Sequence, residues 1–71
     1  MKPMRTKDIM TADEFIHFRT IMGLDQHQIA ELLGVTYQAV YFWENGQRSI
    51  SVTTVRLLRL FNKFPQLLRE F

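Results

Sequence analysis

The most constraining feature of the chain is a pair of short helical segments joined by a three-residue turn. The first segment runs from Gln26 to Gly34 and the second from Thr36 to Gly46. Ala30 is small enough for another helix to cross it closely, and Gly34 can adopt the left-handed conformation that ends a helix. Apolar residues at helical spacing supply the contacts between and beneath the two segments: Ile29, Leu33, Val35, Val40 and Trp43. We therefore predict two helices that cross tightly over a shared apolar face.

Length and composition limit the chain to a small domain stabilised by packing. It has 71 residues, enough for one core, and no cysteine, which excludes disulfides and cysteine zinc sites. No apolar run approaches the roughly 20 residues of a membrane span, and the first ten residues lack the apolar middle of a signal peptide. We therefore expect a cytoplasmic protein with no membrane partner. The net charge of +2 is compatible with nucleic acid but does not require it.

The chain divides into an arm and one domain. Residues 1–10 contain three basic side chains and no helical period, so we predict a flexible basic amino-terminal arm. Residues 11–71 are predicted to form an all-α domain of five short helices, because no alternating strand pattern occurs. Four residues suited to helix caps mark the starts of the first four helices, and a proline suits the first turn of the fifth: Thr11, Asp25, Thr36, Ser51 and Pro65.

A helical wheel separates the second segment of the pair into two faces. Val40 and Trp43 lie on the core face. Two tightly crossed helices of this kind form a helix-turn-helix, whose second helix normally lies in the DNA major groove. Aromatic rings left in water without a partner would be unfavourable, so we predict that the opposite face contacts DNA bases. That face comprises Tyr37, Gln38, Tyr41 and Phe42. The alternative for Tyr37 and Phe42 is that their rings fold over the neighbouring helix.

Phosphate contacts are predicted at both edges of the pair. Gln26 lies at the amino end of its helix, where free amides and the helix dipole favour an anion. Gln47 and Arg48 follow the second helix and are predicted to contact the DNA backbone. The alternative for Arg48 is a solvated charge in a loop.

An ion pair is predicted to join the first predicted helix to the second helix of the pair. Arg19 shares a helix face with apolar residues, where an unpaired charge would be costly. Glu44 follows Trp43 directly. We predict a partly buried pair between Arg19 and Glu44 that fixes orientation more than it adds stability. The alternative is that Arg19 reaches solvent along its aliphatic stem.

These residues resemble the phage repressor/Cro-type (XRE) helix-turn-helix family. The resemblance covers about Thr11 to Phe64, and three motifs carry it: Met22–Gln26, Ile29–Val35 and Trp43–Gly46. It implies a five-helix domain that binds operator DNA as a homodimer and regulates transcription. It also implies a phosphate contact for Gln26, the buried pair Arg19–Glu44, and base contacts for Tyr37, Gln38, Tyr41 and Phe42. The family often has polar residues where this chain has Tyr41 and Phe42, so no operator sequence is implied.

Dimerisation is predicted through the carboxyl-terminal helices. Apolar residues extend beyond the face needed for the core, and those expected to meet a second copy are Phe61, Pro65, Leu68 and Phe71. The alternative is that the last helix only covers its own core. A dimer would place two reading helices about 34 Å apart on an inverted repeat. The leading hypothesis is thus a homodimeric (auto)repressor of a phage or mobile-element operon.

The residues support two other classes of function to different degrees. An enzyme is not expected, because the only histidines, His17 and His27, have no nucleophile motif or carboxylate pair beside them. No metal ion or cofactor is expected either. The stronger alternative is an antitoxin-like or adaptor module whose aromatic face, formed by Tyr37, Tyr41 and Phe42, binds a protein partner.

Overall fold

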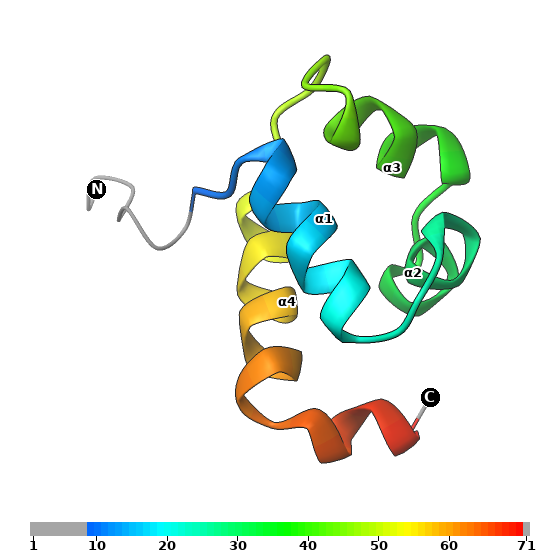
Figure 1. Cartoon of the computed structure of the whole chain (residues 1–71), viewed down its shortest axis with the longest axis vertical. Helices are drawn as coiled ribbons and strands as arrows, with labels where there is room; N and C mark the ends of the chain where they lie inside the picture. Colours follow the sequence, from blue (N-terminus) through cyan, green and yellow to red (C-terminus); the bar gives the residue numbers. More distant parts are fainter. Residues whose placement is uncertain (1–8, 71) are drawn as a thin grey trace.

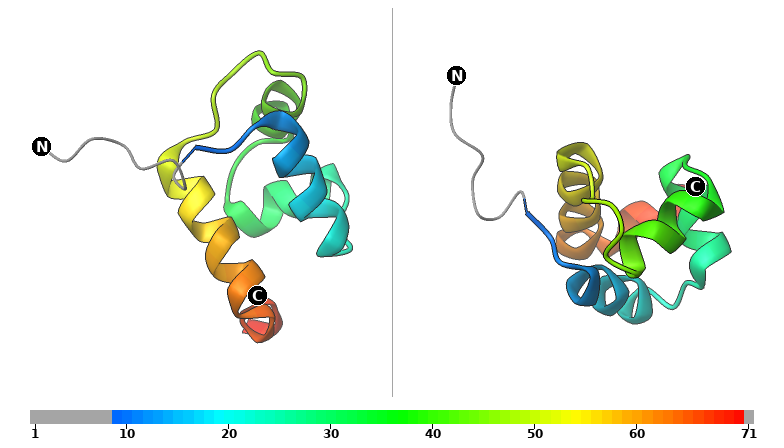
Figure 2. Two further views of the ribbon diagram at one scale, coloured as in Figure 1. Left: turned by 60° about the vertical axis from the view of Figure 1, so that its left-hand side comes forward. Right: turned by 90° about the horizontal axis from the view of Figure 1, so that it is seen from above.

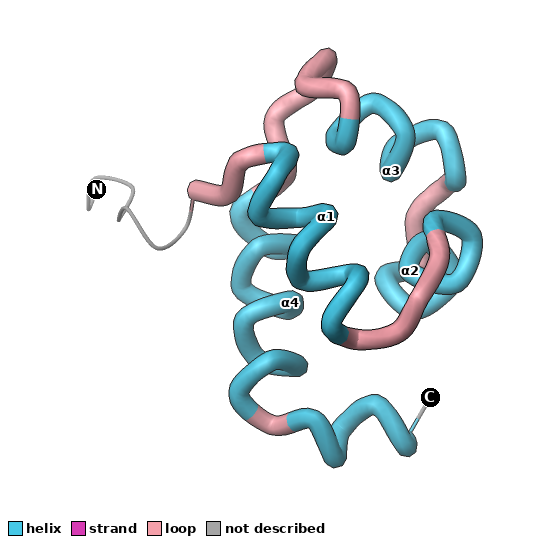
Figure 3. Tube along the Cα trace, in the orientation of Figure 1, coloured by secondary structure: helices cyan, strands magenta, loops and turns pink. Residues whose placement is uncertain are grey.

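The computed structural model describes residues 9–70 and contains no strand within them (Figures 1 and 3). Its elements are α1 (Ala12–Ile21), α2 (Gln26–Leu33), α3 (Tyr37–Glu44), α4 (Val52–Lys63) and η2 (Pro65–Glu70). The predicted all-α, five-helix architecture with a helix-turn-helix is confirmed, and the fifth helix is of the 3-10 type. No helix in the described range combines the length and the apolar character that crossing a membrane requires.

The α-helices begin at the predicted capping residues. Thr11 Oγ1 accepts a hydrogen bond from the Glu14 backbone N–H, and the Glu14 carboxylate accepts one from the Thr11 N–H, both at 3.1 Å. Asp25 and Gln28 form the same reciprocal box at the start of α2, at 2.8 and 2.9 Å. These bonds satisfy amides that a helix start would otherwise leave without a partner. Single side-chain caps begin the other two helices, at Thr36 for α3 and Ser51 for α4.

The turn between α2 and α3 depends on Gly34. Its φ is +71°, in the left-handed region that residues with a Cβ avoid. The backbone N–H groups of Gly34 and Val35 donate to the carbonyls of Glu31 and Ala30, at 3.2 and 3.0 Å. These bonds end α2 and turn the chain within three residues, so that α3 can cross it.

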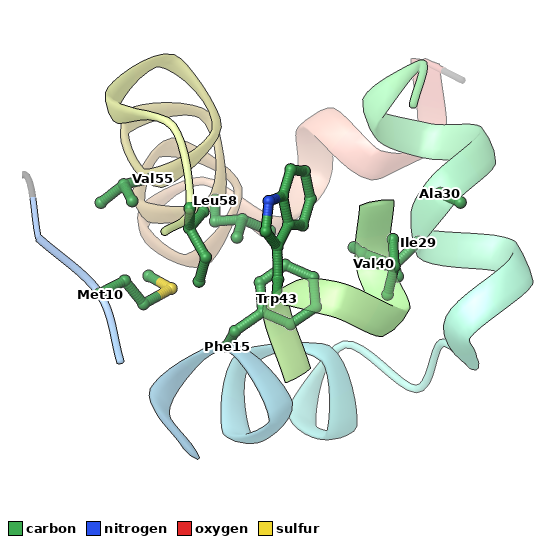
Figure 4. Close-up of a cluster of buried hydrophobic side chains, with 9 residues drawn as sticks. Met10, Phe15, Ile29, Ala30, Val40, Trp43, Val55 and Leu58 are labelled. Atoms are coloured by element: carbon green, nitrogen blue, oxygen red, sulfur yellow. The ribbon is translucent and has the colours of Figure 1, made fainter. Parts of the chain in front are cut away.

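The core lies between α4 and the α2–α3 pair, which occupy opposite sides in the right-hand view of Figure 2. Trp43 stands near the centre of the buried cluster, and its ring meets Phe15 of α1 edge to face, with centroids 5.6 Å apart (Figure 4). Such aromatic contacts add to the free energy gained from burial. The buried apolar residues of this core are Met10, Phe15, Ile29, Ala30, Val40, Trp43, Ile50, Val55 and Leu58.

The amino-terminal boundary of the domain differs from the prediction. Residues 1–8 of the expected arm lie outside the described residues. Met10 was expected in the arm but is only 6% exposed and belongs to the core. Arg59 of α4 donates a hydrogen bond to the Ile9 carbonyl at 3.5 Å. The packed part of the chain therefore includes Met10, which lies in one buried cluster with residues of α1 and α4.

Candidate nucleic-acid interface

The outer face of α3 carries the four side chains that the wheel placed there. Tyr37, Gln38 and Tyr41 are exposed, and Phe42 is half-buried. On the opposite side Val40 and Trp43 are buried in the core. In Figure 1, α3 lies at the edge of the molecule beside α2. It carries no charged side chain between Tyr37 and Phe42.

Tyr37 is engaged by α2. Its ring stacks on the imidazole of His27, with centroids 4.2 Å apart and planes 11° from parallel. Its hydroxyl donates to Oε1 of Gln26 at 3.1 Å. Both contacts follow the alternative in which the Tyr37 ring covers the neighbouring helix. His27 was not among the predicted site residues, because the stack depends on how α2 and α3 cross and has no local sequence signal.

A hydrogen-bonded network joins α1, α2 and α3 beneath the outer face of α3. Arg19 donates from Nε to Oε2 of Glu44 at 2.8 Å and from Nη2 to Oε1 at 3.1 Å. Its Nη1 also donates to the Leu24 carbonyl at 3.1 Å. The structure thus contains the ion pair that the sequence suggested. The Glu44 side chain is only 6% exposed, so these donors replace the water that its carboxylate loses on folding.

Gln26 connects this network to the outer face of α3. Its Nε2 donates to Oε1 of Glu44 at 2.9 Å, while its Oε1 accepts from Tyr37. A carboxamide has two N–H donors, and the bond to Glu44 uses one of them. Gln26, which was predicted to contact phosphate, therefore has a structural role: it holds the start of α2 against both ends of α3.

The carboxyl end of α3 carries a row of two rings and a cation. The rings of Tyr41 and Phe42 meet edge to face, with centroids 5.9 Å apart. The guanidinium carbon of Arg48 lies 5.0 Å from the Phe42 centroid, within the range of a cation–π contact. Gln47 and Arg48 are both exposed, and the Gln47 backbone N–H donates to the Phe42 carbonyl at 2.9 Å. Arg48 is thus placed beside the outer face of α3.

The predicted dimer residues fall into different environments. Phe61 is only 2% exposed, so it belongs to the core of its own chain and offers almost nothing to a partner. The prediction missed Leu60 and Phe64 on the same segment, which are 44% and 39% exposed. Pro65 is exposed and Leu68 is half-buried, whereas Phe71 lies outside the described residues. The solvent-facing apolar surface here consists of Leu60, Phe64 and Pro65.

A shallow groove of about 540 Å³ lies apart from the outer face of α3. It opens between the end of α1, one side of α2 and η2. Its lining is mostly apolar and includes one carboxylate: Met22, Leu24, Gln28, Glu31, Leu32 and Leu68. No cluster of His, Asp and Glu side chains able to hold a metal ion occurs among residues 9–70.

The tight crossing of α2 and α3, the glycine turn and the outward polar and aromatic face define a helix-turn-helix domain. A family model described as "Antitoxin component of bacterial toxin-antitoxin system, MqsA" matches residues 2–71. The chain belongs to this antitoxin family. The match favours the antitoxin alternative, and nothing in it supports a phage repressor of Cro type. No curated protein and no solved structure matches the chain significantly.

Proposed function

We propose that the chain is an antitoxin that binds operator DNA through α3 and regulates transcription. The observation that carries this proposal is the solvent-facing surface of α3, which presents Gln38 and Tyr41 beside Arg48 and the amino end of α2. Aromatic side chains exposed to this degree indicate a partner. The family match supports the antitoxin role. A DNA partner implies action at the nucleoid in the cytoplasm, by binding alone and without catalysis.

In this proposal, α3 lies in the major groove. Gln38 makes a bidentate hydrogen bond to an adenine edge, and Arg48 binds a phosphate beside the groove. The free backbone amides at the start of α2 bind a phosphate on the other side, assisted by the helix dipole. The bonds from Gln26 to Glu44 and Tyr37 hold the two helices in one geometry, so that these contacts can form together.

The proposed DNA-binding species is a homodimer. Leu60, Phe64 and Pro65 form an apolar surface on α4 and η2 that a second copy could cover. Two copies of α3 would then enter successive major grooves about 34 Å apart, which requires an inverted-repeat operator. An operator that overlaps a promoter would be closed to RNA polymerase while the dimer is bound.

A toxin protein is the second proposed partner. The support for it is the family match, whose description names the antitoxin component of a toxin–antitoxin system. The exposed ring of Tyr41 beside Phe42 could serve a protein interface as well as DNA, because aromatic residues are enriched at interface centres. If the toxin occupies the outer face of α3, it and the operator will compete. If it binds elsewhere, a ternary complex will form.

Selection from a genomic DNA library tests the proposal. We expect the wild-type chain to enrich an inverted repeat and Gln38→Ala to lose it. The matched control is Gln66→Ala, since Gln66 is an exposed glutamine on η2 far along the chain from α3. Two results would contradict sequence reading by α3. The protein would retain all DNA fragments alike at every salt concentration, or Gln38→Ala would enrich the same inverted repeat as the wild-type chain. Binding of the cognate toxin that Tyr41→Ala abolishes, with no enriched DNA, would instead favour a protein-binding face.

A further inference from the structure

Tyr37 is held to α2 although it is 39% exposed, since its ring lies on His27 and its hydroxyl is bonded to Gln26. The other side chains of the outer face of α3 are Gln38, Tyr41 and Phe42, none of which contacts α2 in this way. Tyr41 is 45% exposed, and its hydroxyl makes no hydrogen bond within the described residues. One carboxamide and two aromatic rings therefore form the available surface.

The chemistry of this surface limits which bases it can distinguish. Guanine is read mainly by the paired donors of Arg or Lys, and cytosine by the acceptors of Asp or Glu. None of these side chains lies between Tyr37 and Phe42. A carboxamide matches the donor and acceptor of adenine, and an apolar ring matches the C5-methyl group of thymine. Both features belong to A·T pairs.

We infer that α3 recognises thymine methyl groups through the rings of Tyr41 and Phe42, next to an adenine read by Gln38. This inference rests on the proposed function. On the helical wheel Gln38 lies between the two rings, so one carboxamide contact is flanked by two apolar ones. The half-site is therefore a short run of A·T pairs selected by methyl groups as well as by hydrogen bonds.

Contacts within the chain restrain the Phe42 ring, which favours this use. Phe42 lies between the edge contact with Tyr41 and the guanidinium of Arg48. A side chain already held in one position loses little conformational entropy on binding. The Arg48 side chain reaches the Phe42 ring from the loop after α3, so its charge lies beside the two rings. We place the phosphate contact of Arg48 at this position.

Replacing thymidine by deoxyuridine isolates the methyl group. Uracil keeps every hydrogen-bonding group of thymine and lacks only the C5-methyl. Burying one methyl group changes affinity about fourfold, so loss of the two symmetry-related methyl groups of a dimer site should weaken binding about sixteenfold. The probe is the operator selected above, resynthesised with deoxyuridine at each thymine position in turn. The measurement is Kd by fluorescence anisotropy at fixed salt.

Variants assign the effect to particular side chains. Tyr41→Ala and Phe42→Ala should each bind the thymine and uracil operators more nearly equally, whereas Tyr41→Phe should keep the discrimination because the ring remains. Gln38→Ala should weaken both operators and leave their ratio unchanged. Circular dichroism checks that each variant is folded, and Tyr41, being exposed, removes no core contact.

The outcomes separate the two proposals. An enriched operator that wild-type protein binds equally with thymine or uracil overturns methyl recognition and leaves DNA reading in place. An enriched half-site with guanine at the contacted positions would also overturn methyl recognition, and it would indicate that Arg48 contacts the base. Absence of any enriched sequence overturns both proposals together. A uracil penalty of about sixteenfold that Tyr41→Phe retains and Tyr41→Ala loses supports the inference.

Discussion

At the scale of single residues, the Glu44 carboxylate joins α1 and α2 to the end of α3. Its carboxylate accepts from Arg19 through both oxygens and from Gln26 through Oε1. A carboxylate this buried is tolerated only with such donors around it. Loss of any one donor therefore affects both the free energy of unfolding and the position of α2 relative to α3.

Removing one partner of the ion pair should destabilise the domain. Arg19→Met or Glu44→Leu alone should lower the free energy of unfolding by about 3 kcal/mol, because each leaves a charge without its partner in a poorly hydrated site. That loss should lower Tm by roughly 10 °C or more in a domain of this size. The double variant should be less destabilised than the sum of the two, since it removes both charges.

Urea unfolding of the four proteins of this cycle measures the coupling. Glu31→Leu is a suitable control, because Glu31 is exposed and forms no ion pair among the described residues. Single variants with the same urea midpoint as wild type would show that the pair does not contribute to stability.

Residue-level prediction succeeded where charge alone decides the outcome. Arg19 shares a helix face with apolar residues, which favoured an acidic partner over a path to solvent along its stem. Glu44, at the end of the helix that carries Trp43, was the acid predicted for it. The pairing of Tyr37 with His27 could not be predicted, because a stack depends on the angle at which α2 and α3 cross. For the same reason, the helical wheel could not show that Tyr37 contacts α2 whereas Tyr41 does not.

At the scale of elements, the turn between α2 and α3 makes one backbone prediction. A Cβ added at Gly34 meets no atom within 4 Å, so the cost of a substitution comes from φ alone. Gly34→Ala should lower the free energy of unfolding by about 1 kcal/mol, and Gly34→Asn by less, because asparagine visits the left-handed region more readily. Equal stability of Gly34→Ala and wild type in urea would exclude this account of the turn.

Element boundaries were predictable where local chemistry sets them. Thr11, Asp25, Thr36 and Ser51 each accept a hydrogen bond from the amide three residues ahead, so the start of each α-helix is encoded within a few residues. The burial of Met10 was not predictable in this way. Met10 precedes every helix and becomes buried only after α1 and α4 come together.

At the scale of the whole molecule, exposed apolar surface predicts the dimer. Leu60→Glu combined with Phe64→Glu should shift sedimentation to the monomer and weaken operator binding, because carboxylates in an apolar contact lose hydration without a partner. The matched control adds two carboxylates in the same segment, Asn62→Glu with Gln66→Glu, at exposed polar positions. A test variant that remains dimeric would place the interface elsewhere, and a control variant that dissociates as fully would assign the effect to added charge in this segment.

The number of cations at the proposed interface makes a prediction about salt. The proposal assigns one cation per subunit, Arg48, to a phosphate, so the dependence of log Kd on log salt should be shallow. Arg48→Gln should lower that slope by about 0.9 per subunit, or about 1.8 for a dimer. Arg69→Gln, at an exposed position on η2, serves as the control. An unchanged slope in Arg48→Gln would contradict a phosphate contact by Arg48.

The separation of the two sides of α3 has a consequence for evolution. Val40, Trp43 and Glu44 hold the helix in the fold, while the side chains of Gln38 and Tyr41 make no hydrogen bond within the described chain. Substitutions of these two side chains should therefore be close to neutral for folding. If α3 reads DNA as proposed, duplicated copies of the domain can diverge toward separate operators through two codons, with no change in the core.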